Sequence, residues 1–284
     1  MSVRDWIRPI LPKKWADPAP VVPVVRVNGA IGLSTPLRPG VTMGGLASVL
    51  ERAFSVKRAP AVAVIVNSPG GSPVQSHLIY KRIRALSEEK ETPVLVFVED
   101  VCASGGYMIA VAGDEIYVDE SSIVGSIGVV SQGFGFVGLM EKLGIERRLH
   151  TSGDRKAILD PFQPERPEDV AHLKLLQEDI HAEFRDMVKA RRGDLLSETD
   201  DLFSGLFWSG RTAVGLGLAD GIGDIRTIVR KRFGEEVRLK LMSQPRGLPF
   251  RRAPGGVALP DGDGLARGLV SALEERALWS RYGL

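Results

Sequence analysis

Short apolar runs alternate with stretches of helical periodicity through the first half of the chain. Buried strands are predicted where apolar and β-branched residues follow one another almost without interruption, over residues 21–29, 61–66, 93–99 and 115–119. A helix is predicted over residues 42–55, and Ser72 followed by Pro73 supplies the cap and first-turn proline of another. This alternation indicates an α/β fold with a mainly parallel sheet.

The second half continues this pattern with longer helices. Residues 124–130, a helix near 136–143 and a strand over 145–150 are expected to extend the layered body. The longest helix is predicted over residues 167–191, and its apolar stripe is typical of a packing face. A helix over 225–233 and a strand near 237–242 complete the body.

Composition divides the chain into four parts. Residues 1–20 form a proline-rich N-terminal arm, and residues 21–242 carry the alternating elements. Residues 243–264 have the composition of a linker. The last part, 265–284, contains an amphipathic helix over 265–280, which we expect to dock on the body or to serve in assembly.

The overall composition excludes several classes of function. The 284 residues carry a net charge of +2, too balanced to indicate nucleic acid or an anionic membrane as the partner. A single cysteine and four histidines without metal-ligand spacing predict neither a disulfide nor a metal site, and no motif calls for a cofactor. No signal-peptide core opens the chain and no apolar run approaches the ~18 residues of a membrane span. We therefore expect a protein in the cytoplasm or peripheral to the inner membrane, with peripheral membrane contact through the N-terminal arm left open.

Two loops follow buried strands at the edge where open α/β sheets place their ligands. The first, NSPGGS at 67–72, has two glycines that permit close approach of a substrate backbone. The second, VCASGGYMIA at 101–110, places Ser104 at a strand-to-helix corner, where its hydroxyl and the following N–H groups can form a nucleophile and an oxyanion site. Ser104 can instead be a simple helix cap, and Cys102 is a rival nucleophile or a small buried residue.

A serine nucleophile needs a base, and the histidines offer no support for one. His77 and His150 lack the pattern of a triad, while His172 and His181 belong to the long predicted helix. A lysine can act as the base when loss of water leaves its amine neutral. Lys156 is the best candidate, because the apolar Ala157, Ile158 and Leu159 follow it.

Five segments in order resemble the SppA/SohB family of signal peptide peptidases. They are VNSPGGS (66–72), ASGGYMIA (103–110), VGSIGVV (124–130), SGDRKAILDPF (152–162) and GRTAVGLGLADGIGD (210–224). The resemblance implies a Clp/crotonase-type fold and a Ser–Lys dyad of Ser104 and Lys156. It also implies oxyanion donors at the backbone of Gly70 and Gly105, with Gly71 as the alternative to Gly70. Gly71 and Ser126 are further expected to contact the substrate.

The resemblance predicts a serine endopeptidase that hydrolyses remnant signal peptides or other extended apolar peptides through an acyl-enzyme. With one set of motifs in the chain, it also predicts a homo-oligomeric ring, an octamer, in which neighbouring subunits share the dyad. Three alternatives stay open: a crotonase-like acyl-CoA enzyme, a Clp-type Ser/His/Asp peptidase, and a non-catalytic ring scaffold for membrane protein quality control.

Overall fold

The computed structural model describes residues 19–32, 40–243 and 272–284 of the chain. The predicted N-terminal arm, most of the linker and the start of the last helix lie outside these residues, apart from residues 19–20, which precede the first strand. Within the described ranges, no helix has the length and apolar character needed to cross a membrane.

One mixed sheet of eight strands forms the centre of the molecule. Its strands are β1 (Val21–Asn28), β2 (Val62–Ser68), β3 (Val94–Ala103), β4 (Glu115–Val118), β5 (Ile123–Gly125), β6 (Phe207–Ser209), β7 (Gly221–Ile222) and β8 (Arg238–Leu241). The order is β6-β5-β3-β2-β1-β8, with β4 paired to β3 and β7 to β4. Every one of these pairs is parallel except β5–β6. The predicted α/β class with a mainly parallel sheet is confirmed.

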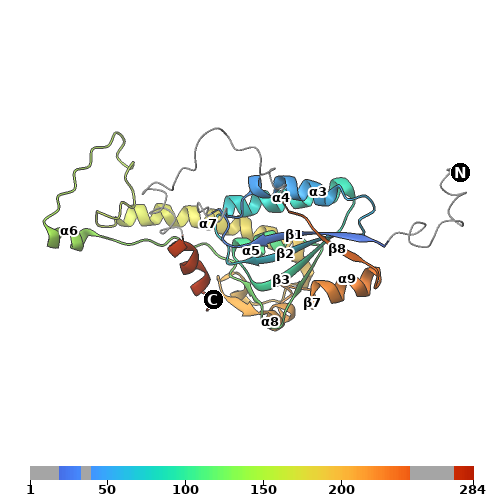
Figure 1. Cartoon of the computed structure of the whole chain (residues 1–284). Coiled ribbons are helices and arrows are strands. Elements are labelled where there is room, and N and C mark those ends of the chain that lie inside the picture. The colour runs from blue at the N-terminus through green and yellow to red at the C-terminus, as the bar shows by residue number, and fades with distance from the viewer. Residues whose placement is uncertain (1–18, 33–39, 244–271) are drawn as a thin grey trace, which may run out of the picture.

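Helices cover both faces of the sheet (Figure 1). They are α3 (Met43–Phe54), α4 (Pro73–Lys90), α5 (Gly105–Ala110), α6 (Val137–Leu143), α7 (Pro167–Arg192), α8 (Gly210–Gly215) and α9 (Ile225–Phe233), with short 3₁₀ turns at Gly193–Leu195 and Asp200–Phe203. A further helical segment spans residues 272–280. As predicted, the Ser72 hydroxyl accepts the N–H of Gln75 and Pro73 opens α4.

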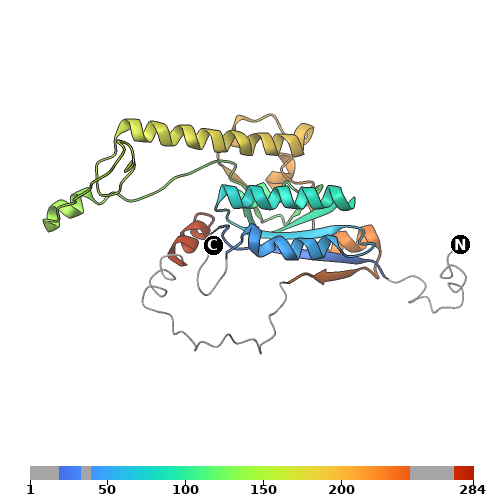
Figure 2. The same ribbon diagram turned by 90° about the horizontal axis from the view of Figure 1, so that it is seen from above.

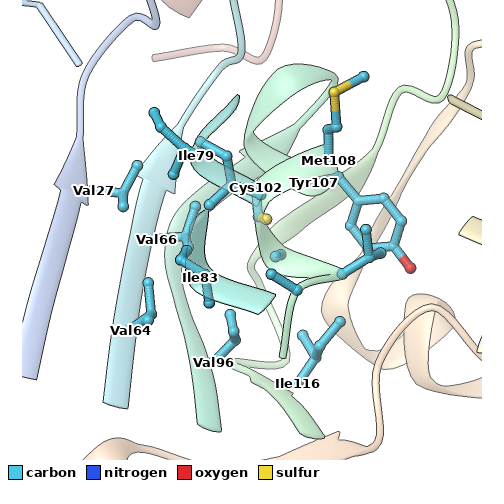
Figure 3. Close-up of a cluster of buried hydrophobic side chains, with 14 of the residues drawn as sticks. Val27, Val64, Val66, Ile79, Ile83, Val96, Cys102, Tyr107, Met108 and Ile116 are labelled. Carbon is cyan, nitrogen blue, oxygen red and sulfur yellow. The ribbon is translucent and has the colours of Figure 1, made fainter. Parts of the chain in front are cut away.

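The main hydrophobic core lies between the sheet and the helices α3, α4 and α5. Figure 3 shows how Val64 and Val66 of β2 and Val96 of β3 lie with Ile79 and Ile83 of α4. A second cluster fills the opposite face, where Val229 of α9 is fully buried. Burial on both faces explains the nearly continuous apolar sequence of the central strands.

Residues 131–166, which we name the projecting arm, extend away from this layered body (Figures 1 and 2). The arm carries α6, which has no buried residue. The strand predicted over 145–150 is wrong: all six residues are exposed coil, because a strand needs a pairing partner and these residues leave the sheet. The expectation that the helix near 136–143 and residues 145–150 extend the layered body is also wrong, because both belong to the projecting arm.

Helix α7 connects the projecting arm to the body. Its predicted packing face is confirmed for the C-terminal half, where Phe184, Met187 and Val188 are buried in the main core. Leu175 and Leu176 in the N-terminal half are 60% and 48% exposed. The body therefore holds only one end of the helix.

We predict that Arg192 fixes this end of α7. Its guanidinium is 4% exposed, lies 2.8 Å from the Asp220 carboxylate and donates to the Gly217 carbonyl oxygen at 2.8 Å. Arg192→Ala should lower the free energy of unfolding by about 3 kcal/mol in urea titrations, because the Asp220 carboxylate loses its cation and the Gly217 carbonyl oxygen loses its donor. Arg211→Ala breaks the exposed pair with Glu120 and should cost less than about 1 kcal/mol. Equal losses in the two variants would contradict this role.

Candidate active site

Ser104 occupies the junction between β3 and α5 in a strained backbone conformation. Its φ of 51° and ψ of −121° are rarely adopted by residues other than glycine. The backbone is held there because the Ser104 N–H donates to the Gly125 carbonyl oxygen at 2.9 Å and its own carbonyl accepts the N–H of Met108 at 3.0 Å. The hydroxyl makes no capping hydrogen bond to α5. Strain together with a hydroxyl that has no hydrogen-bond partner among the described residues is typical of a nucleophile at a strand-to-helix turn.

The Gly70–Gly71 loop lies directly beside Ser104. A β-carbon on Gly70 would lie 2.8 Å from the Ser104 β-carbon, and one on Gly71 would lie 2.1 Å from the Ile31 carbonyl oxygen. Both glycines have positive φ, at 99° and 140°. The loop is fixed to the segment after β1 because the Ile31 N–H donates to Gly70 and the Ser72 N–H donates to Ile31, both at 2.8 Å. Only glycine fits this close backbone approach.

Gly70 and Gly71 differ in the hydrogen bonding of their backbone N–H groups. The Gly70 N–H donates to the Ser68 hydroxyl at 3.2 Å. The Gly71 N–H has no hydrogen bond to any residue that the structure describes. Gly71 also lies near Gly105, since a β-carbon on Gly105 would be 3.4 Å from the Gly71 nitrogen. This arrangement favours Gly71 over the predicted Gly70 as the partner of Gly105 in binding an oxyanion.

Ser126 follows Gly125, whose carbonyl oxygen accepts the N–H of Ser104. It too has positive φ, at 52°, and its N–H donates to the Leu206 carbonyl oxygen at 2.7 Å. The residue is 5% exposed. It is next in the chain to the residue that binds the Ser104 backbone, and its expected contact with substrate stays a prediction.

Lys156 does not lie at this corner. It belongs to the projecting arm, its side chain is exposed, and its backbone N–H closes a turn to the Gly153 carbonyl oxygen at 3.2 Å. Across the described residues, no hydrogen bond or ion pair joins its amine to another group. A single subunit therefore presents Ser104 without the predicted base.

Two histidines and two carboxylates that could serve as alternatives are engaged elsewhere. His77 on α4 pairs with Glu183 of α7 at 2.9 Å, and His181 Nε2 lies 3.2 Å from the Ile127 carbonyl oxygen. Of the carboxylates near the corner, Glu99 pairs with Arg26 and Asp100 accepts a hydrogen bond from Asn67. None of these four groups hydrogen-bonds to Ser104 in the described part of the chain.

The C-terminal residues reach the same edge of the sheet. Trp279 and the buried Tyr282 pack against Val101 and Ala103, the residues that precede the serine corner. The Tyr282 ring also meets Phe207 edge to face, with centroids 5.0 Å apart. Figure 2 shows the end of the chain beside the carboxyl ends of the strands. The amphipathic pattern predicted a helix for docking or for assembly, and apolar spacing alone could not identify where its end packs.

Comparison with known proteins gives consistent matches. Residues 87–239 match the sequence model of Peptidase family S49. The chain is 32% identical to a protein of Synechocystis that carries a protease name, over 82% of each chain, and 29% identical to the chloroplastic serine protease SPPA of Arabidopsis thaliana, over 72% of this chain and 31% of that protein.

A protein of Brucella abortus named Na(+)/H(+) antiporter NhaA is 53% identical over 98% of this chain. The chain spans only 39% of that protein's length. The S49 match, at residues 87–239, falls within the part that the two proteins share.

We predict that Cys102 is chemically inert in the folded protein. Its side chain is fully buried in the core, and burial raises the pKa of the thiol well above its usual range. A thiol reagent such as iodoacetamide should label it only after unfolding. Labelling of the native protein at the rate of the unfolded chain would restore Cys102 as a rival nucleophile.

Proposed function

The chain belongs to peptidase family S49, and we propose that it is a serine endopeptidase in which Ser104 works with Lys156 of a neighbouring subunit. The observation that carries this proposal is the strained Ser104 corner beside two converging glycine amides. A hydroxyl that caps no helix lies next to the Gly71 and Gly105 N–H groups, which have no hydrogen bond to any described residue, and this combination meets the geometric needs of acyl transfer.

The proposed reaction proceeds through an acyl-enzyme. The neutral amine of Lys156 removes the proton of the Ser104 hydroxyl, and Oγ attacks the carbonyl carbon of the peptide bond. The N–H groups of Gly71 and Gly105 stabilise the oxyanion, each contributing about 3–4 kcal/mol to lowering the barrier. The lysine then gives its proton to the departing amine. In the second step it takes a proton from the water that attacks the ester and returns it to Ser104 Oγ as the acid product leaves.

The projecting arm supports a dyad that is shared between subunits. Its apolar side chains lie open to solvent: Val130 at its base and Phe134, Leu139, Leu143 and Ile145 along it are each more than half exposed. Exposed apolar surface of this extent is typical of an interface. Docking on a neighbouring subunit would bury this surface and would bring Lys156 into dry surroundings that favour its neutral form. The family resemblance extends the proposal to a closed ring.

The arm has enough internal structure to act as a rigid carrier for Lys156. Phe136 and Phe162 stack with ring centroids 5.5 Å apart, and the Arg147 guanidinium lies over Phe162. Arg147 also pairs with Asp160 at 2.7 Å. These contacts join the two sides of the arm around the turn that contains Lys156.

We further propose extended apolar peptides, remnant signal peptides among them, as substrates. Exposed apolar side chains border the carboxyl edge of the sheet: Val74 and Leu78 in the first turns of α4, and Leu206 and Phe207 beside β5. Such side chains would bind apolar segments better than polar ones. Among the alternatives, a crotonase-like reaction would need a free carboxylate at the oxyanion site, and the nearby Glu99 and Asp100 are both paired.

Mixing two inactive variants tests the shared dyad. Ser104→Ala and Lys156→Ala, each expressed alone, should lose peptidase activity. Co-expressed with different tags, they should form mixed rings. A site is complete only where one subunit keeps Ser104 and the neighbour that serves it keeps Lys156. Random mixing produces this arrangement at about a quarter of the sites, so the rings should have about a quarter of the wild-type activity. Lys174→Ala, which removes an exposed lysine outside the arm, should keep full activity.

Three results would contradict the proposal. Activity in Ser104→Ala alone would exclude the nucleophile, and mixed rings as inactive as the single variants would exclude sharing between subunits. A wild-type protein that assembles into rings but cleaves no apolar peptide would favour the scaffold alternative.

A further inference from the structure

The pairing of β2 with β3 contains a large irregularity just before Ser104. Val66 pairs with Val98, and the next pair is Ser68 with Cys102. Two steps along β2 therefore correspond to four steps along β3, so that β3 carries a bulge around Glu99 and Asp100. The bulge changes which residue of β3 lies level with the glycine loop.

Because of this register, Ser104 lies level with Gly70. Continued regularly from the pair Val66–Val98, the strands would place Cys102 level with Gly70. With the bulge, Ser104 is level with it instead, so close that a β-carbon on Gly70 would lie 2.8 Å from the Ser104 β-carbon. The bulge thus sets the relative position of the nucleophile and the oxyanion loop.

The Asn67 side chain fills the gap that the bulge opens in the ladder. Its Oδ1 accepts the backbone N–H of Val101 at 3.1 Å, and its Nδ2 donates to the Asp100 carboxylate at 2.7 Å. Its own backbone carbonyl accepts the N–H of Gly29 beyond β1 at 3.0 Å. One residue therefore connects β2 to both of its neighbours at the level of the bulge.

The opposite side of the bulge is also held. The buried Ser122 hydroxyl donates to the Glu99 carbonyl oxygen at 2.6 Å and accepts the N–H of Asp119 at 3.0 Å. The bulge is thus clamped between Asn67 and Ser122. Asn67 is the clamp on the side of the glycine loop, where its loss would let Ser104 shift relative to Gly71.

We propose that Asn67 is a positioning residue for catalysis, acting through the β3 bulge to hold Ser104 in register with the glycine amides. This inference rests on the proposed peptidase function for its kinetic consequences. Asn67 itself touches neither the Ser104 hydroxyl nor an oxyanion. Its removal should therefore reduce the rate of the chemical step more than the binding of the substrate.

Reversing the hydrogen bond provides the sharpest test. Asn67→Ala should lower kcat about tenfold to a hundredfold with little change in KM, as expected for a small misplacement of reacting groups. Asn67→Asp places two carboxylates face to face and should be at least as impaired. Adding Asp100→Asn to it restores the hydrogen bond with donor and acceptor exchanged, and should recover most of kcat.

The matched control is Asn28→Ala. Asn28 pairs with Asn67 at the same level of the sheet, its side chain is exposed, and it makes no side-chain hydrogen bond to any residue that the structure describes. It should leave kcat unchanged. A kcat for Asn67→Ala within about twofold of wild type, or a double variant no better than Asn67→Asp, would overturn the inference.

A second measurement separates this inference from the proposed function. Hydrogen exchange of the Val101 amide should be faster in Asn67→Ala than in wild type, because that amide loses its acceptor. If the wild-type protein has no activity that depends on Ser104, the proposed function fails, and this exchange measurement still tests the clamp. Unchanged protection of Val101 in the variant would overturn the inference whatever the activity.

Discussion

The register between β2 and β3 is the constraint on which the catalytic account depends. A bulge of β3 brings Ser104, rather than Cys102, level with the glycine loop. The serine then holds a backbone conformation that costs on the order of 1–3 kcal/mol. The body of the protein can maintain this strain because Val101, Cys102 and Ala103 are fully buried on the two faces of the sheet immediately before it. A well-packed strand therefore holds the strained corner at which we propose the nucleophile.

The second constraint is the separation of the proposed nucleophile from the proposed base. The corner belongs to the rigid sheet, whereas Lys156 belongs to an arm that packs on itself and exposes its apolar residues. If neighbouring subunits complete each site, catalysis and assembly are linked, and activity should depend on protein concentration wherever the oligomer dissociates. In that arrangement an isolated subunit would be inactive.

Much of the body could be predicted from the sequence because it depends on local signals. Continuous β-branched runs identified β1, β2 and β3, and the Ser72–Pro73 pair marked the start of α4. Long-range features gave no such signal. The bulge in β3, the role of Asn67 and the choice between Gly70 and Gly71 depend on pairings between strands that are distant in sequence. The strand predicted over 145–150 failed for a related reason, since its residues have strand-like character but leave the sheet that could pair with them.

An experimental structure of the assembled protein tests the central claim most directly, through the distance between the Lys156 amine and the Ser104 hydroxyl of adjacent subunits. The account predicts a separation of about 2.6–3.2 Å, within hydrogen-bond reach, with the amine enclosed by apolar side chains of the arm and of the neighbouring body. An oligomer in which every Lys156 amine remains in solvent and far from Ser104 of any subunit would contradict it.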